Sequence, residues 1–183
     1  YANWLQQQDA EVAREYWRKS LQEIEAPTLH GIKQHVESGE GIQTQHLLSL
    51  TPKNSQALNS LAKRYDVTLN TLFQFAYAYL LYRYSGQTKV VFGQTVSGRT
   101  ADVQGIGQMV GLFINTLPVT VDFGSENSLS DCLKQMHEQQ VERERFGYLP
   151  LAEIQQLSGV RANTGLFKSL MVFENFPMGA NAS

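Results

Sequence analysis

Four histidines and one cysteine are the side chains from which an acid–base or nucleophilic centre would have to be built. A catalytic histidine needs a neighbouring acid, and a metal-binding histidine needs a second ligand at a suitable spacing. None of the four has either, and the cysteine lies on the apolar face of a predicted helix, which indicates a small hydrophobic side chain. These residues are His30 and His35 in a polar loop, His46 in a predicted strand, His137 on the solvent side of a helix, and Cys132.

A glycine-rich segment between two predicted strands is the second feature with possible chemistry. Gly105–Gly111 has glycines spaced unlike a dinucleotide fingerprint, and no strand precedes it. The glycines at 98, 105, 107 and 111 are instead expected to allow tight turns or close backbone approach. A long loop holding Ser97, Arg99 and Asp102 is either functional or a plain surface connection, and the residues alone leave both open.

Composition narrows the class of protein. The 183 residues, 42% of them hydrophobic, suit one domain with a sizeable core, here counted as residues 1–183. A net charge of −2 argues against nucleic acid as a partner, one cysteine excludes a disulfide framework, and no apolar run is long enough to span a membrane. The chain shows no signal-peptide pattern and begins without Met, as an excised fragment would, so a cytoplasmic location is expected.

The elements that would position these residues alternate irregularly between helix and strand. Each helix is predicted from apolar spacing and a capping residue, and each strand from alternation or an apolar run. Pro118 cannot donate a ladder hydrogen bond, so its strand is expected at a sheet edge or at a bulge. The predicted helices cover 9–27, 51–65, 68–84, 128–145 and 151–157, and the predicted strands cover 43–50, 89–96, 116–123 and 167–173. This order favours an α/β fold, specifically an α+β sandwich with a mixed sheet, over a doubly wound sheet.

The helix that follows Ser128 has two predicted faces. Ser128 resembles the first residue of a capping box and is expected to begin the helix. The apolar side chains predicted to face the core are Leu129, Cys132, Leu133, Met136 and Val141. Those predicted to face water are Glu138, Glu142, Arg143 and Glu144.

Several ordered motifs together resemble the second half of the condensation domain of nonribosomal peptide synthetases. The resemblance covers essentially the whole chain. Its motifs are Tyr1–Leu5, Tyr16-Trp17, Asp66–Leu72, Val91–Arg99, Gly105–Pro118, Tyr148–Leu151 and Leu170–Asn175. The sequence departs from the family pattern at Thr120, where Arg is usual, and at Asn163–Leu166. The motif at Gly111–Leu117 favours the condensing subtype of the family.

The resemblance implies a fold of two chloramphenicol-acetyltransferase-like lobes, of which this chain matches the C-terminal lobe only. The catalytic His-His-x-x-x-Asp-Gly motif belongs to the other lobe, and no two histidines are adjacent here. The family joins two carrier-bound thioester substrates by an amide bond inside a tunnel, mainly by positioning them. This lobe would then supply tunnel wall and floor, and the isolated chain is expected to be inactive.

The resemblance also implies which residues line the channel or the boundary between lobes. Ser97, Gly98 and Arg99 would begin a loop that reaches the partner lobe and floors the site, and Asn115 with Thr116 would face the channel. Two other interpretations remain open: a structural hydrogen bond for Asn115, and an ion pair that fixes the loop for Arg99.

No cofactor is expected to bind directly, since the phosphopantetheine arms belong to the carrier proteins. The implied partners are the N-terminal lobe of the same domain, donor and acceptor carrier proteins and a neighbouring adenylation domain, with no nucleic acid and no membrane. Two alternatives stay open. One is a non-catalytic docking module of the same fold, and the other is a small acyltransferase with an intersubunit site.

Overall fold

A computed structural model describes residues 1–28, 43–99, 103–124, 128–161 and 163–174 of the chain. Its α-helices are α1 (Ala2–Gln6), α2 (Ala10–Leu21), α3 (Pro52–Arg64), α4 (Leu69–Ser85), α5 (Leu129–Arg145) and α6 (Leu151–Gln156). Its strands are β1 (Lys89–Val96), β2 (Asn115–Asp122) and β3 (Leu170–Met171), and a short 3-10 helix, η1, spans Ile106–Gln108.

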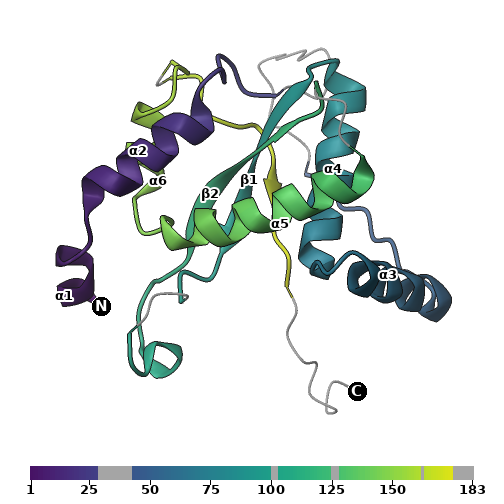
Figure 1. Ribbon diagram of the computed structural model, residues 1–183, viewed down its shortest axis with the longest axis horizontal. Helices are drawn as coiled ribbons and strands as arrows, with labels where there is room; N and C mark the ends of the chain where they lie inside the picture. Colours follow the sequence, from purple (N-terminus) through teal and green to yellow (C-terminus); the bar gives the residue numbers. More distant parts are fainter. Residues whose placement is uncertain (29–42, 100–102, 125–127, 162, 175–183) are drawn as a thin grey trace.

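The strands form one mixed sheet in the order β2-β1-β3. β1 and β2 run antiparallel, with Phe92 opposite Val119, whereas β3 runs parallel to β1 and pairs at Gly93. Helices surround this sheet, with α3 and α4 towards one side of the view and α1, α2 and α6 towards the other (Figure 1). The mixed sheet packed with helices confirms the predicted α/β class. Pro118 lies on β2, an edge strand of the sheet as described, in agreement with its missing N–H.

The largest side chains of the core pack on both sides of β1. Val90 and Phe92 form one cluster with Ala78 and Leu81 of α4 and with Met136 of α5. α4 therefore contacts both the sheet and α5, although Tyr79, Leu80 and Tyr84 of the same helix are 47%, 49% and 68% exposed.

A second cluster joins the N-terminal part of the chain to the C-terminal part. Val91 and Leu117 pack with Trp17 and Leu21 of α2 and with Ile154 of α6. Trp17 is 1% exposed, and its indole nitrogen donates a 3.0 Å hydrogen bond to the carbonyl of Phe146. The polar atom of this large ring is therefore satisfied inside the core.

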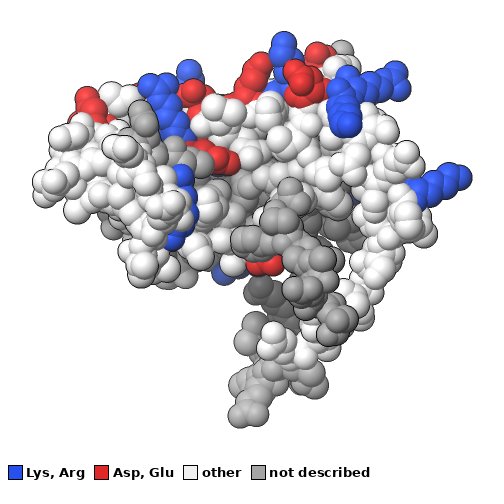
Figure 2. Space-filling view, turned by 90° about the horizontal axis from the view of Figure 1, so that it is seen from below, with Lys and Arg blue, Asp and Glu red and all other residues white. Residues whose placement is uncertain are grey.

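Charged side chains are unevenly distributed over the surface. In the view from below, most of them lie along the upper margin, and much of the described surface that faces the viewer is uncharged (Figure 2). Within the described ranges, no helix is both long and apolar enough to cross a membrane.

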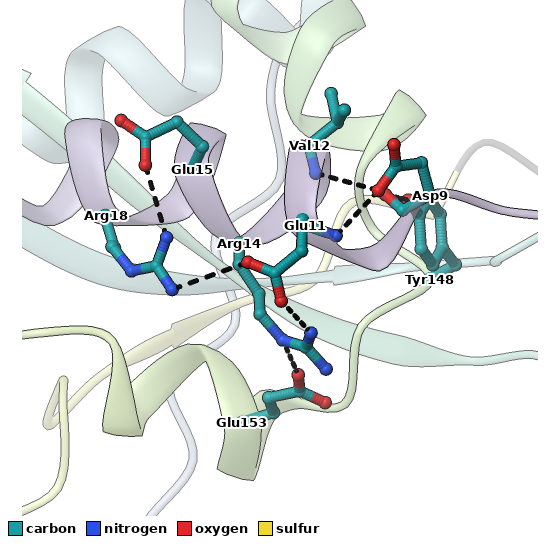
Figure 3. A network of polar contacts seen from close by, with 8 residues as sticks. All are labelled: Asp9, Glu11, Val12, Arg14, Glu15, Arg18, Tyr148 and Glu153. Carbon is teal, nitrogen blue, oxygen red and sulfur yellow. Dashed lines mark hydrogen bonds and ion pairs between the residues drawn. The ribbon is translucent and has the colours of Figure 1, made fainter.

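A polar network on the surface ties α2 to α6 and to the turn before it (Figure 3). Arg14 pairs with Glu153 of α6 at 2.7 Å and also with Glu11 on its own helix. The Tyr148 hydroxyl donates to the carbonyl of Asp9 at 3.1 Å. Exposed ion pairs contribute little to stability, about 0–1 kcal/mol each, so their main effect is to fix how α2 and α6 meet.

The predicted helix starts are confirmed by their caps. Asp9 accepts hydrogen bonds from two backbone amides at the start of α2, and Thr51, Thr68 and Ser128 each accept one at the starts of α3, α4 and α5. α4 ends at Gly86, whose φ of +70° is the left-handed conformation that glycine adopts without strain.

Two of the predicted strands are wrong or too long. Residues 43–50 form no strand, because they find no pairing partner within the described chain, and His46 is therefore exposed instead of half-buried. The segment 167–173 pairs with β1 only at Leu170 and Met171. The first helix is also shorter than predicted and ends at Leu21, while Ile24 reaches the core from the turn that follows.

The two predicted faces of α5 need correction. Leu133 and Met136 are buried as predicted, but Leu129 is 45% exposed and Val141 is 58% exposed. Arg143, predicted to face water, is buried. The buried residues Leu133, Met136 and Arg143 follow one helical stripe, and Val141 lies off it. Leu129 lies on the stripe, but it is the first residue of the helix and stays partly exposed. Cys132 and His137 are half-buried, and a 3.3 Å contact joins His137 Nδ1 to the Thr71 hydroxyl on α4.

Phe92→Ala should destabilise the fold strongly. The Phe92 side chain is 0% exposed and meets the Tyr77 ring edge-on, so its removal leaves a cavity between β1 and α4. The expected loss is about 3–5 kcal/mol in the free energy of unfolding, measured by urea denaturation. Val12→Ala is the control, because Val12 is 51% exposed and its truncation should change stability by less than about 0.5 kcal/mol. Equal losses in the two variants would contradict the described core.

Candidate functional site

The loop between β1 and β2 is held closed by the side chain of Arg99. Its Nη1 donates to the carbonyls of Ile106 and Met109, the latter at 3.0 Å. The guanidinium carbon also lies 4.3 Å from the ring centroid of Phe113, a cation–π geometry. Arg99 therefore fixes the loop, as one of the interpretations from the sequence expects. It does so through backbone carbonyls and an aromatic ring, and not through an ion pair.

Close backbone approach at the start of this loop requires glycine. Gly98 has a φ of +64°, and a Cβ atom there would lie 1.7 Å from the carbonyl oxygen of Phe113. The two ends of the loop can touch only because position 98 carries no side chain. The preceding residue contributes a weaker contact, in which the Ser97 hydroxyl accepts a 3.4 Å hydrogen bond from the amide of Arg99.

Asn115 joins the start of β2 to the turn after α5. Its side-chain amide donates to the carbonyls of Gly147 at 2.8 Å and Leu149 at 2.9 Å. Its Oδ1 accepts a 2.9 Å hydrogen bond from the amide of Thr116. Both amide hydrogens of Asn115 are thus used inside the chain, so what remains for a ligand is acceptor capacity at Oδ1.

These contacts surround a groove of about 900 Å³. Gly98 and Asn115 line the groove, whereas Ser97, Arg99 and Thr116 are not among its lining residues. Arg99 lies over the ring of the lining residue Phe113, and the amide of Thr116 donates to Asn115. Aromatic rings make up much of the wall: Tyr1 meets Phe113 at 5.0 Å between centroids, and Trp4 meets Tyr148 at 5.7 Å, both edge-on. The full lining is Tyr1, Trp4, Leu5, Gln8, Val96, Gly98, Leu112, Phe113, Ile114, Asn115, Val141, Glu144, Arg145, Gly147, Tyr148 and Pro150.

The groove has hydrogen-bonding groups but no evident acid–base pair. Burial raises the pKa of Tyr1 and of Tyr148, so both phenols stay neutral near pH 7. The Tyr148 hydroxyl already donates its hydrogen to Asp9, whereas Tyr1 can donate a hydrogen bond to a ligand. No His, Cys, Asp and Glu cluster suited to a metal ion occurs among the residues that the structure describes. The arrangement can bind and orient a slender substrate. No histidine is among the described lining residues, and the carboxylate of Glu144, which is, accepts a 3.0 Å hydrogen bond from Gln140.

A buried cation is a structural feature that sequence reasoning missed. Arg143 is 4% exposed, and its Nη2 donates to the side-chain oxygens of Gln74 at 3.1 Å and Gln94 at 3.2 Å. Burial lowers the pKa of Arg143 to about 10. The signal in the sequence is its spacing, since Arg143 lies at i+7 from Met136 and i+10 from Leu133 on the buried stripe of α5.

Comparison with known proteins identifies the family of this chain. A family model described as "Condensation domain" matches residues 1–182. The chain belongs to the condensation-domain family. This is the amide-forming domain family of nonribosomal peptide synthetases, in agreement with the resemblance seen in the sequence motifs.

The relatives are large nonribosomal peptide synthetases. The chain is 42% identical over 178 residues to chondramide synthase of Chondromyces crocatus, and 42% identical over 182 residues to one component of the linear gramicidin synthase of Brevibacillus parabrevis. The two matches include 97% and 98% of this chain, but only 5% and 4% of the lengths of the two relatives.

Solved structures agree on the fold. The first condensation domain of the CDA synthetase superposes with a TM-score of 0.72 at 17% identity, over 94% of this chain and 37% of that one. A four-domain nonribosomal peptide synthetase superposes with a TM-score of 0.73 at 19% identity, over 94% of this chain and 13% of that one. At these identities the likeness defines the fold and nothing more.

Gly98→Ala should disrupt the loop more than Gly105→Ala. Both glycines have positive φ, so alanine costs about 1–2 kcal/mol of backbone strain at either position. Only at position 98 does the new Cβ also collide with a carbonyl, since nothing lies within 4 Å of a Cβ at position 105. Limited proteolysis of the loop should therefore be faster in the first variant. Equal rates would mean that the close approach to Phe113 is absent.

Asn115→Asp should destabilise the groove. The change replaces two N–H donors by a carboxylate that faces the carbonyls of Gly147 and Leu149. The expected loss is about 2–5 kcal/mol in the free energy of unfolding, because unpaired polar groups and an unpaired charge are costly. Asn59→Asp is the matched control, since Asn59 makes a similar hydrogen bond to Ser55 on an exposed helix face. A change at 115 no larger than at 59 would argue against the described contacts.

Proposed function

We propose that this chain is the C-terminal lobe of a condensation domain that forms an amide bond between two carrier-bound thioester substrates. The lobe supplies the wall and floor of the tunnel, and the other lobe supplies the catalytic histidine. The observation that carries the proposal is the groove at the β1–β2 loop. It is lined largely by aromatic and aliphatic side chains, and no histidine is among its described lining residues.

The chemistry assigned to this lobe is positioning. Holding an amine near a thioester in a fixed orientation replaces a slow bimolecular encounter by an effectively intramolecular one. The residues of this chain would do so indirectly: Arg99 keeps the loop closed, Gly98 lets its two ends meet, and Asn115 anchors β2 to the turn after α5. The phosphopantetheine arms of the carrier proteins would enter as part of the substrates, and the neutral phenol of Tyr1 is available to donate a hydrogen bond to an amide.

An exposed apolar loop supports a partner lobe on this side of the molecule. Val110, Leu112 and Ile114 are 102%, 89% and 62% exposed. Large apolar side chains gathered on one exposed loop are typical of a surface that another protein segment covers. Donor and acceptor carrier proteins and an adjacent adenylation domain are proposed as the further partners, from the multidomain relatives.

The proposal is tested by comparing this chain with the complete condensation domain that contains it. Donor and acceptor carrier proteins, each loaded with an aminoacyl thioester, are mixed with either form, and dipeptidyl thioester is measured by mass spectrometry. The complete domain should form product, and the chain alone should not, because it lacks the double-histidine motif. Turnover by this chain alone would refute the assignment of roles.

Arg99→Met in the complete domain should lower the rate of dipeptide formation at least about tenfold, since misplacement of a floor loop by about 1 Å is costly. Arg83→Met is the control, because Arg83 is exposed on α4 and is not among the lining residues of the groove. The same assay measures both variants, and circular dichroism verifies that both are folded. Unchanged activity in the Arg99 variant would remove the loop from the proposed site.

A further inference from the structure

One carboxylate lies among the described residues that line the groove at the β1–β2 loop. It belongs to Glu144, in the last turn of α5, and the other charged residue of the described lining is Arg145. Val141, Glu144 and Arg145 are spaced i, i+3 and i+4, so they form one side of the helix, and all three line the groove. The wall that α5 contributes to the groove therefore carries an anionic group.

The Glu144 carboxylate has one oxygen available to a ligand. Its Oε1 accepts a 3.0 Å hydrogen bond from Gln140 Nε2. Its Oε2 makes no hydrogen bond within the described chain, and it is not among the buried polar atoms that lack a partner. Oε2 is therefore accessible, while the hydrogen bond to Oε1 restricts how the carboxylate can turn.

The Gln140 side chain is itself fixed by α4. Its Oε1 accepts hydrogen bonds from Gln74 Nε2 at 3.3 Å and from the Thr71 hydroxyl at 3.5 Å. Gln74 and Thr71 are each 1% exposed, so these contacts lie in the interface between α4 and α5. They hold Gln140, and through it Glu144, in one orientation. A carboxylate that is held in advance loses less conformational freedom when it binds a ligand.

Two arginines flank Glu144 in the sequence, and neither forms an ion pair with it among the described residues. Arg145 has a side chain that is 70% exposed and lies 3.8 Å from Glu142. Arg143 is buried and donates to Gln74 and Gln94. Burial lowers the pKa of Arg143, and the charge of Glu144 opposes this effect. Glu144 thus compensates a buried cation from a distance, while its Oε2 stays available to a second one.

Further features of the groove favour a cation as its ligand. α5 ends at Arg145, and the C-terminal end of a helix carries a partial negative charge. The rings of Tyr1, Trp4 and Tyr148 line the groove, and the faces of aromatic rings attract ammonium groups. Asn115 also lines the groove, and its Oδ1 keeps acceptor capacity beyond the hydrogen bond from Thr116.

We propose that Glu144 binds the ammonium form of the acceptor substrate's amine through Oε2. The proposal rests on the proposed function of the groove, and it names the residue that selects the amine-bearing substrate. Of the two substrates, the donor reacts at its thioester carbonyl, so only the acceptor must present a free amine. An α-amino group has a pKa of about 8 and is therefore mostly charged near pH 7. Glu144 acts in binding alone, and removal of the proton before attack is left to the histidine of the other lobe.

The first test measures binding without turnover, in the complete condensation domain. The acceptor carrier protein is loaded through an unreactive amide in place of the thioester, either with alanine or with lactate. The two arms have nearly the same shape, and only the alanyl arm carries an ammonium group. Isothermal titration calorimetry should show at least about tenfold tighter binding of the alanyl form, as expected for a charge-assisted hydrogen bond. Equal affinities for the two forms would refute the proposal, and this comparison needs no variant that could misfold.

Glu144→Gln should abolish the preference for the alanyl arm. The new amide keeps an oxygen for the hydrogen bond from Gln140 but carries no charge. In the dipeptide assay, the KM for the acceptor aminoacyl carrier protein should rise at least about tenfold with kcat little changed, because the lost interaction is one of binding. Glu138→Gln is the matched control and should alter neither, since Glu138 is exposed on the same helix and does not line the groove.

Two failures are distinguishable. If the unaltered complete domain forms dipeptide but the Glu144 variant keeps its KM or its preference for the alanyl arm, this inference is wrong and the proposed function stands. If the unaltered complete domain forms no dipeptide, the proposed function fails, and the inference fails with it.

Discussion

The structure depends on β1 lying at the centre of the sheet. β2 pairs along its whole length on one side, β3 pairs at two positions on the other, and both major core clusters include its side chains. Val90, Val91 and Phe92 are each at most 1% exposed, so apolar side chains of β1 are buried on both faces. The groove inherits its position from this strand, because Gly98 and Arg99 follow directly after β1 ends at Val96.

The groove is formed mainly by contacts that close the chain on itself. Arg99 uses its hydrogen bonds on two loop carbonyls, and Asn115 uses its amide on two carbonyls after α5. These residues are expected to face substrate by family resemblance, yet both amide hydrogens of Asn115 and the described side-chain hydrogen bonds of Arg99 are used in shaping the wall. That division of labour suits a lobe whose proposed role is to orient substrates while another lobe supplies the proton-transferring group.

Much of the fold could be predicted from the sequence because local signals agree with the tertiary structure. Caps at Asp9, Thr51 and Ser128 begin helices as expected, and Pro118 lies on an edge strand. The failures occur where partners decide the outcome. Residues 43–50 are predicted as a strand but have no described strand to pair with, and β propensity without a partner does not make a sheet.

The candidate site could be located from sequence, but its internal geometry could not. Motifs locate Gly98 and Asn115, whereas their contacts with Phe113 and Gly147 join residues that no spacing rule connects. Arg143 escapes prediction because charge normally indicates exposure, although its position on the buried stripe of α5 indicates the opposite.

The turn after α5 has a mechanical consequence. A Cβ atom on Gly147 would lie 2.7 Å from Leu117 Cδ1 and 3.2 Å from the carbonyl oxygen of Arg143, so the turn is packed directly against β2. The same residue is held by Asn115 through its carbonyl. Because Gly147 is held both by its carbonyl and by its packing against Leu117, the end of α5 and the start of β2 are joined rigidly. A tilt of α5 would therefore also move the wall of the groove that the start of β2 forms.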